Sequence, residues 1–156
     1  MTSTQRNTKV MNRFDLTQRL VTKLKDEAVI GGIGAGIIAQ GLIYRGADGA
    51  AGDIGHIQIS PPEETVEPQP VCRCGNTGCI EAYGGGWALM RDLRAGGREV
   101  SAVADVARLI ESGDPLAVSL VRRAGRFIGV ALSDAVSLLN PSVVVVGGEL
   151  AARTPT

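Results

Sequence analysis

The spacing of apolar and polar residues along the first half of the chain predicts short strands joined by tight turns. Residues 28–44 read AVIGGIGAGIIAQGLIY. They predict a short strand, a glycine-rich turn and then a hairpin in which Gln40-Gly41 turns between IIA and LIY. Residues 56–60, HIQIS, alternate like a half-buried strand. Residues 61–70 are rich in proline and acidic side chains, which predicts an exposed loop.

The second half of the chain predicts helices. Residues 80–97, IEAYGGGWALMRDLRAGG, predict a helix that starts near Glu81 and is weakened by Gly84–Gly86. Residues 101–114, SAVADVARLIESGD, predict another helix, which Ser101 can cap. Its apolar side chains recur at helical spacing and form one stripe. The stripe contains Val103, Val106, Ala107 and Ile110.

A third helix has signals at both ends. Asp114-Pro115 combines an N-cap acid with proline at the first helical position, and Asn140-Pro141 stops the helix after Leu139. The residues that it is expected to bury are Leu120, Ala124, Phe127, Ala131, Ala135 and Val136. The run VVVV at 143–146 predicts a buried strand because it is short and β-branched. A hairpin, helices and a strand in this order favour an α/β fold.

Composition narrows the classes of function. The 156 residues suffice for one ordinary domain, and 44% apolar with 21% charged residues is a soluble globular composition. The formal net charge is zero, so no global field draws the chain to nucleic acid or to a membrane. No apolar run approaches the roughly 20 residues of a membrane span. An odd cysteine count without a signal peptide fits the cytoplasm, where thiols stay reduced.

All three cysteines lie within eight positions, Cys72-x-Cys74-x-x-x-x-Cys79. Gly75 and Gly78 let the backbone fold back there, so three thiolates can meet on one turn. Zinc prefers four tetrahedral ligands, and the only histidine, His56, can supply the fourth. The alternative is three reduced, partly buried thiols beside an ordinary strand histidine. The odd count makes a disulfide less favoured than either.

Two further groups of residues are candidates for ligand binding. The glycine turn at 32–36 can present backbone N–H groups to phosphate, although it matches neither dinucleotide nor P-loop patterns and is equally well explained as a hairpin connection. If a metal joins the two segments, Asp53, His56 and Glu81 converge. Carboxylates and an imidazole around a cleft suit the hydroxyls of a sugar. Each of these side chains can equally be a solvated charge.

Three stretches together resemble a known family. They are GIGAGIIAQGLIYRGADGAAGDIGHIQI, CRCGNTGCIEAY and DPLAVSLVRRAGRFIGVALSDAVSLLNPSVVVVGGEL. They closely resemble the ROK family of bacterial sugar kinases and sugar-responsive transcriptional repressors, from about Val29 to Ala152. The combination of a Gly-His pair with C-x-C-G-x-x-G-C-x-E is highly specific to that family. The resemblance implies an actin-like, ribonuclease-H-like ATPase fold with a zinc-braced loop, of which this chain resembles the C-terminal lobe.

The resemblance also implies roles for individual residues. It assigns a structural zinc ion to a histidine and three cysteines, which are His56, Cys72, Cys74 and Cys79. It assigns sugar contacts to Asp53, His56 and Glu81. Asp53 is one methylene shorter than the usual glutamate, which implies a longer or water-mediated contact. Phosphate and nucleotide contacts are implied for two glycine turns, represented by Gly32, Gly34, Gly36, Gly147 and Gly148.

The sequence departs from the family's kinases in two motifs. Those kinases need an Asp-x-Gly-Gly-Thr phosphate loop and an Asn-Asp pair whose aspartate activates the sugar hydroxyl, and neither occurs here. The chain is therefore not expected to phosphorylate a sugar, and ATP with Mg²⁺ is expected only if it is a kinase fragment. The favoured interpretation is the carbohydrate-sensing module of a ROK-type transcriptional regulator. The alternatives are a fragment of a glucokinase or N-acetylhexosamine kinase, and a remnant that binds no ligand.

The predicted domain boundary lies near residue 27. Residues 1–27 are expected to be a separate segment outside the family, with a weakly amphipathic helix from about Asn12, and residues 28–156 the sugar-binding lobe. The family implies a homodimer, for which Trp87 and the helix at 115–139 are interface candidates. The expected partner is a small sugar or sugar derivative. DNA is expected to bind only through a domain that this chain lacks.

Overall fold

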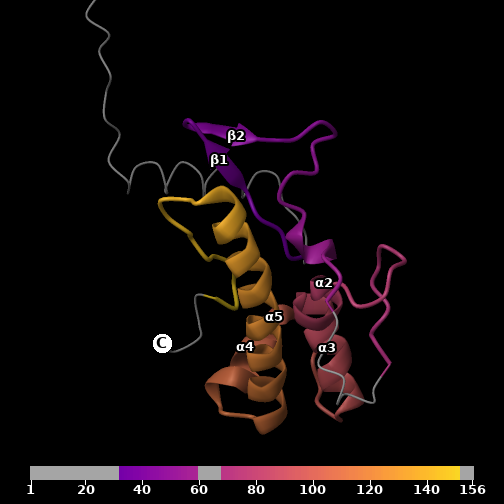
Figure 1. Ribbon diagram of the computed structural model, residues 1–156. Helices are drawn as coiled ribbons and strands as arrows, with labels where there is room; N and C mark the ends of the chain where they lie inside the picture. Colours follow the sequence, from indigo (N-terminus) through magenta and orange to yellow (C-terminus); the bar gives the residue numbers. More distant parts are fainter. Residues whose placement is uncertain (1–31, 60–67, 152–156) are drawn as a thin grey trace, which may run out of the picture. The chain divides into compact units, whose positions relative to one another are not determined.

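The computed structural model describes residues 32–59 and 68–151, all within one compact unit, Gly31–Thr156 (Figure 1). The helix expected from about Asn12, the strand at 28–30 and most of the acidic loop lie outside the described residues. The described elements follow in this order: β1 (Ile37–Ala39), β2 (Leu42–Tyr44), the 3-10 turn η1 (Ile54–His56), α2 (Ile80–Gly84), α3 (Gly86–Ala95), α4 (Val103–Glu111) and α5 (Pro115–Leu139).

The predicted hairpin is confirmed. β1 pairs antiparallel with β2, with Ile37 opposite Tyr44 and Ala39 opposite Leu42. Gln40 and Gly41 have φ angles of 55° and 80°, so both turn residues are left-handed. Two left-handed residues are what a type I′ turn requires, and the twist of this turn matches that of the flanking strands.

The strand expected at 56–60 is wrong at its start. His56 ends the 3-10 turn η1, and only after it does the chain extend, where Gln58 forms an isolated bridge with Cys79. The His56 N–H donates to the Asp53 carbonyl at 3.3 Å and the Ile57 N–H donates to the Ile54 carbonyl at 3.2 Å, so these backbone groups close a turn and are not available to a strand. Gly55 in this turn also lies close to the segment before β1, since a Cβ at Gly55 would lie 2.1 Å from the carbonyl oxygen of Ile33.

The single helix expected from Glu81 is two helices. Gly85 is extended, with φ −64° and ψ 149°, and is both the C-cap residue of α2 and the N-cap residue of α3. Its N–H still donates to the carbonyl oxygen of Glu81 at 2.9 Å. The break redirects the chain, so Glu81 lies on α2 and Trp87 on the first turn of α3.

The helix at 115–139 has the predicted bounds. The Asp114 carboxylate accepts the N–H of Ala117 at 2.9 Å, and Asn140 ends α5 in the left-handed conformation with φ 43°. Ser101, however, does not cap α4. The Asp105 carboxylate accepts the N–H groups of both Ser101 and Ala102, so the helix begins one residue later, with Ala102 as its N-cap residue.

The main core lies where α3, α4 and α5 pack together, and α2 packs against both α5 and η1 (Figure 1). The buried side chains of this core are Leu89, Leu93, Val100, Val106, Ala117 and Leu120. The predicted stripe of α4 faces this core, with Val106 and Ala107 fully buried. α2 and η1, which carry the candidate ligand residues, therefore rest on a helical base. No helix among the described residues combines the length and apolar character needed to cross a membrane.

The buried strand expected at 143–146 is wrong. The four valines form no strand and are 46–67% exposed. β1 and β2 pair only with each other, so no described strand is hydrogen-bonded to these valines. A strand is held by hydrogen bonds to a neighbouring strand, and β-branching alone does not supply them. Val136, also expected in the core, is 42% exposed near the same end of α5.

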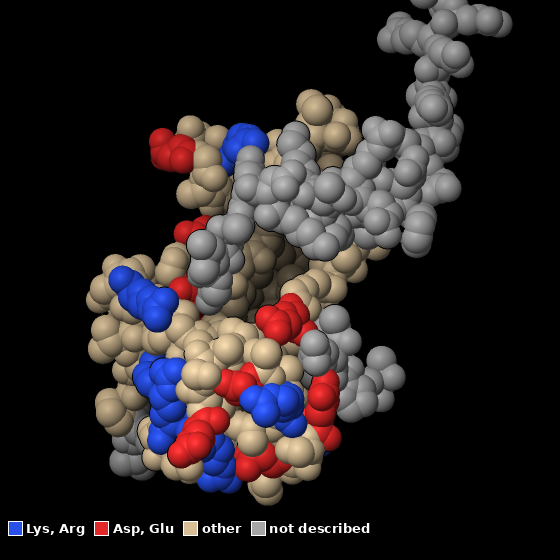
Figure 2. Space-filling view, turned by 180° about the vertical axis from the view of Figure 1, so that it is seen from behind, with Lys and Arg blue, Asp and Glu red and all other residues tan. Residues whose placement is uncertain are grey.

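Charged side chains of both signs are interspersed on the face shown in Figure 2. Ion pairs join charges that are distant in sequence: Arg98 Nε lies 3.0 Å from Asp114 Oδ2, and Arg123 Nη2 lies 2.9 Å from Asp92 Oδ2. The presence of both signs agrees with the zero net charge of the chain.

Candidate metal and ligand site

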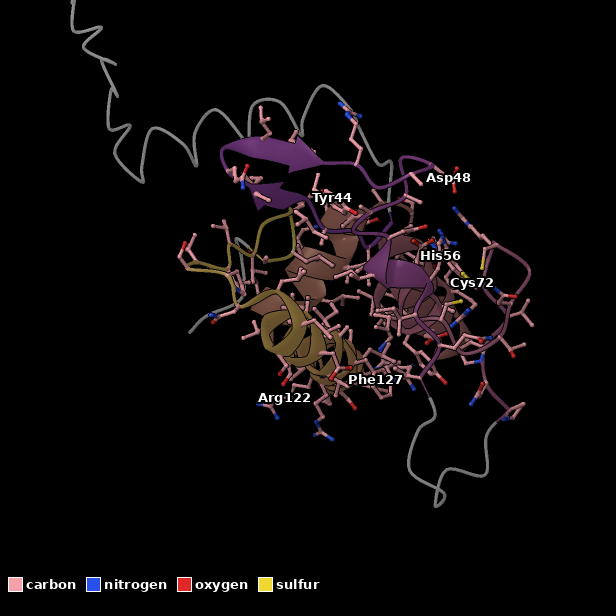
Figure 3. All side chains as sticks on the ribbon, turned by 45° about the horizontal axis from the view of Figure 1, so that its top comes forward. Tyr44, Asp48, His56, Cys72, Arg122 and Phe127 are labelled. Carbon is pink, nitrogen blue, oxygen red and sulfur yellow. The ribbon has the colours of Figure 1, made fainter. Side chains whose placement is uncertain are left out.

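The histidine and the three cysteines lie together. The ligand atoms of His56, Cys72, Cys74 and Cys79 are all within 4.8 Å of one another. His56 Nδ1 lies 3.6 Å from Cys72 Sγ, and Cys74 Sγ lies 3.7 Å from Cys79 Sγ. Tetrahedral zinc, with its usual bond lengths, separates two sulfurs by about 3.8 Å and a sulfur from a nitrogen by about 3.6 Å. The group therefore fits a four-coordinate metal ion. Figure 3 shows His56 beside Cys72 and the sulfur atoms of the turn.

The turn that carries the cysteines is set by its own backbone. The Cys72 N–H donates to the Asn76 carbonyl at 2.7 Å, and the Gly75 N–H donates back to the Cys72 carbonyl at 3.0 Å. Gly75 and Gly78 have φ angles of 95° and 74°, which favour glycine. A bridge between Gln58 and Cys79 then ties the turn to the chain just after His56.

The thiols differ in their surroundings. Burial raises the pKa of the Cys79 thiol to about 12, and that side chain is fully buried. The backbone N–H of Asn76 lowers the pKa of the exposed Cys74 thiol. All three cysteines are free, and 3.7 Å between Cys74 and Cys79 is far beyond a disulfide bond. This arrangement favours the binding of a metal cation that takes thiolates as ligands.

One ring nitrogen of His56 faces the cysteine thiols, and the other ring nitrogen faces Asp53. Its Nδ1 lies beside Cys72, whereas its Nε2 lies 4.0 Å from Asp53 Oδ1. That distance is too long for a direct hydrogen bond. Both side chains are partly open to solvent, with 33% of His56 and 54% of Asp53 exposed. A hydroxyl group can therefore approach Nε2 and the carboxylate while Nδ1 holds a metal.

Glu81 lies beside the same turn. A Cβ at Gly55, between Asp53 and His56 in sequence, would lie 3.3 Å from Glu81 Oε2. The Ile33 N–H donates to Oε2, and the indole N–H of Trp87 donates to Oε1, each at 3.2 Å. Asp53 and His56 thus share one turn, and Glu81 contacts that turn from α2. The sequence named Trp87 only as an interface candidate and did not identify its contact with Glu81, because the break at Gly85 hides the spacing of the two residues.

The glycine turn at 32–36 lies against the Asp53 turn. The Ala35 N–H donates to the Gly52 carbonyl at 2.7 Å, and a Cβ at Gly52 would lie 1.9 Å from the Ala35 oxygen. Gly52 also has a φ of 96°, so only glycine suits this approach. Gly34 and Gly36 are exposed, as are Gly147 and Gly148 beyond the four valines. Their phosphate and nucleotide contacts stay predictions.

One histidine and three cysteines beside two carboxylates define a class of protein, which similarity to known proteins identifies. The sequence matches the ROK family over residues 9–155, and the chain belongs to this family. The match begins within residues 1–27, and the boundary near residue 27 stays a prediction. The resemblance stated from the motifs is therefore confirmed.

Repressors and kinases both occur among the relatives. An N-acetylglucosamine repressor of Shigella flexneri is 34% identical over 128 residues, 76% of this chain and 30% of the repressor. A glucokinase of Halalkalibacterium halodurans is 32% identical over 131 residues, 75% of this chain and 38% of the glucokinase. The crystal structure of a ROK hexokinase from Thermus thermophilus matches with a TM-score of 0.66 at 39% identity. That match covers 80% of this chain and 40% of the hexokinase, so the chain spans well under half of these relatives. Such neighbours imply the actin-like ATPase fold.

Proposed function

We propose that this chain is a zinc-braced sugar-binding module of a ROK-type transcriptional regulator. One juxtaposition carries the proposal: His56 offers one nitrogen to the cysteine turn and the other to the space beside Asp53, and Glu81 lies against the η1 turn that contains His56. A metal site and a set of hydroxyl acceptors thus share one side chain.

The metal is proposed to brace the site. Three thiolates and one imidazole fill four tetrahedral positions, and a zinc ion held in this way has no open position for a substrate. It would fix the His56 ring through Nδ1 and hold the turn that carries Cys72 against the segment after η1. Asp53 and Glu81 would then accept hydrogen bonds from sugar hydroxyls, and charged acceptors make the stronger bonds.

The regulator class is favoured by the repressors among its relatives. The 156 residues contain no Asn-Asp pair and no Asp-x-Gly-Gly-Thr loop, so they are not expected to phosphorylate a sugar by themselves, and this holds for a regulator and for a kinase fragment alike. The repressor from Shigella flexneri is named for N-acetylglucosamine, so that sugar is the first ligand proposed here. In this proposal the module acts within a homodimer and reaches DNA through a separate domain.

A sugar kinase fragment is the second candidate. It is favoured by the similarity to the Thermus thermophilus hexokinase, at 39% identity and a TM-score of 0.66. A fragment without the Asn-Asp base is not expected to phosphorylate glucose by itself, so the test is ATP binding: calorimetric binding of ATP with Mg²⁺ by the purified chain would favour this candidate over the regulator.

Calorimetry on the full 156-residue chain tests the binding function. N-acetylglucosamine and glucose are titrated into protein whose zinc content is measured by native mass spectrometry. We expect one zinc ion per chain and binding of at least one sugar. Glu81→Gln should weaken that binding at least about tenfold, since a charged acceptor is replaced by a neutral amide, with zinc unchanged. Zinc-loaded protein that binds neither sugar would refute the proposed function.

A further inference from the structure

We propose that Trp87 is a positioning residue of the ligand site: its indole N–H holds the Glu81 carboxylate, and its ring ties that carboxylate to the cysteine turn. This inference rests on the proposed function, because only there is Glu81 assigned to the sugar.

The orientation of Glu81 depends on two donors from different parts of the chain. Trp87 Nε1 donates to Oε1 and the Ile33 N–H donates to Oε2, each at 3.2 Å. A carboxylate oxygen can accept a second hydrogen bond, so each oxygen retains capacity for a sugar hydroxyl. Removing the indole N–H leaves the carboxylate held at one oxygen only, and it can then rotate.

The backbone is shaped to allow this contact. Gly85 lies between the helices that carry Glu81 and Trp87. A Cβ there would lie 3.0 Å from Glu81 Cγ and 3.2 Å from Trp87 Nε1. The φ of Gly85 is −64°, which any residue adopts, so glycine is needed here for space and not for its conformation. The absence of a side chain at position 85 lets the indole reach the carboxylate.

The same indole contacts the cysteine turn. Trp87 packs against the buried group formed by Cys72, Cys79 and Ala82. The guanidinium of Arg73, between two of the cysteines, lies 4.7 Å from the centre of the indole ring, within cation–π range. Loss of the metal would release this turn and with it one side of the indole. Metal occupancy and sugar affinity are therefore coupled through Trp87, and the coupling is reciprocal.

The first test is Trp87→Phe in the full chain, with zinc content and sugar affinity measured together. Phenylalanine keeps an aromatic ring and loses the N–H. We expect zinc to stay at one per chain. The Kd for N-acetylglucosamine, or for glucose if that is the sugar bound, should rise about tenfold, because one hydrogen bond to a charged group is lost. Tyr83→Phe is the matched control, since it removes a hydroxyl from the helix of Glu81 and keeps the ring packing on Phe127; its affinity should not change.

Wild-type affinity in Trp87→Phe would overturn the inference. Loss of zinc in this variant would also overturn it, because Trp87 would then act through the packing of the cysteine turn and not through Glu81.

A second test needs no sugar. Trp87 is the only tryptophan, so the protein has one indole N–H resonance in a proton–nitrogen NMR spectrum. Glu81→Gln should move this resonance upfield, because a charged acceptor is replaced by a weaker one, and zinc removal with a chelator should move it as well. An unmoved resonance in Glu81→Gln would refute the contact. If the wild type binds neither sugar, the proposed function fails, and this spectrum still decides whether Trp87 holds Glu81.

Discussion

Replacing Cys74 with serine tests whether the histidine and three cysteines hold a metal, because Cys74 packs least of the four against the rest of the molecule. It is exposed, whereas Cys79 and Cys72 are 0% and 3% exposed. A change at Cys74 therefore removes a metal ligand with almost no loss of packing. A metal that binds the folded chain only, at a free concentration 1,000 times its Kd, stabilises the fold by about 4 kcal/mol.

Urea unfolding, followed by the fluorescence of Trp87 beside the turn, measures this difference. With zinc, the wild type should lose about 4 kcal/mol of unfolding free energy when a strong chelator is added. Cys74→Ser with zinc should match the chelated wild type, and the chelator should not destabilise the variant further. The difference in unfolding free energy between wild type and variant could instead be as large in the presence of chelator as in the presence of zinc. The Cys74 thiol would then stabilise the protein through packing, and the metal hypothesis would be refuted.

Two further predictions concern the helical base and the exposed valines. The N–H of Ala117 lowers the pKa of Asp114, so the stability from this cap is present above the unfolded pKa of about 4 and is lost as pH falls through the folded value. Asp114→Ala should therefore unfold at lower urea than the wild type at pH 7, and the difference should narrow below about pH 4. Val145 is 58% exposed in the run at 143–146, and we expect it to promote self-association of the chain. In analytical sedimentation, Val145→Thr should show a dissociation constant for self-association that is several-fold higher than that of the wild type. Its zinc content should be unchanged. An equal constant would exclude this run from the contact.

Local chemistry explains which elements the sequence predicts. The hairpin turn and both ends of α5 depend on residues within a few positions of one another, namely Gln40-Gly41, Asp114-Pro115 and Asn140. These were correct. The start of α4 was wrong because Ser101 and Asp105 both offer a polar group to the same backbone, and the carboxylate of Asp105 accepts both N–H groups. A choice between two local partners is decided by geometry that the sequence does not contain.

The wrong strands have causes distant in sequence. The extended run expected to start at His56 begins after it, because His56 belongs to the 3-10 turn η1; Gly55 in this turn lies close to Ile33, 22 positions earlier. The valines at 143–146 have the composition of a strand but no hydrogen-bonded strand among the described residues. For the candidate site, the spacing of the cysteines predicted that their thiols lie together on one turn. The contact between Trp87 and Glu81 was not predictable, because it depends on the helix break at Gly85.

The contacts among the residues of the candidate site lie within one part of the chain, which rests on α5 through α2. The contacts that bring Asp53, His56, Glu81 and the cysteines together all join positions between Ile33 and Trp87. They consist of backbone bridges, close glycine approaches and the proposed metal, none of which involves the valines at 143–146. Those valines and the C-terminal end of α5 expose apolar surface, as do Leu42, Tyr44 and Val71 elsewhere among the described residues. Sugar binding should therefore depend on the metal and on Trp87 more than on whatever covers that surface. A variant that changes self-association through Val145 should leave the sugar Kd unchanged.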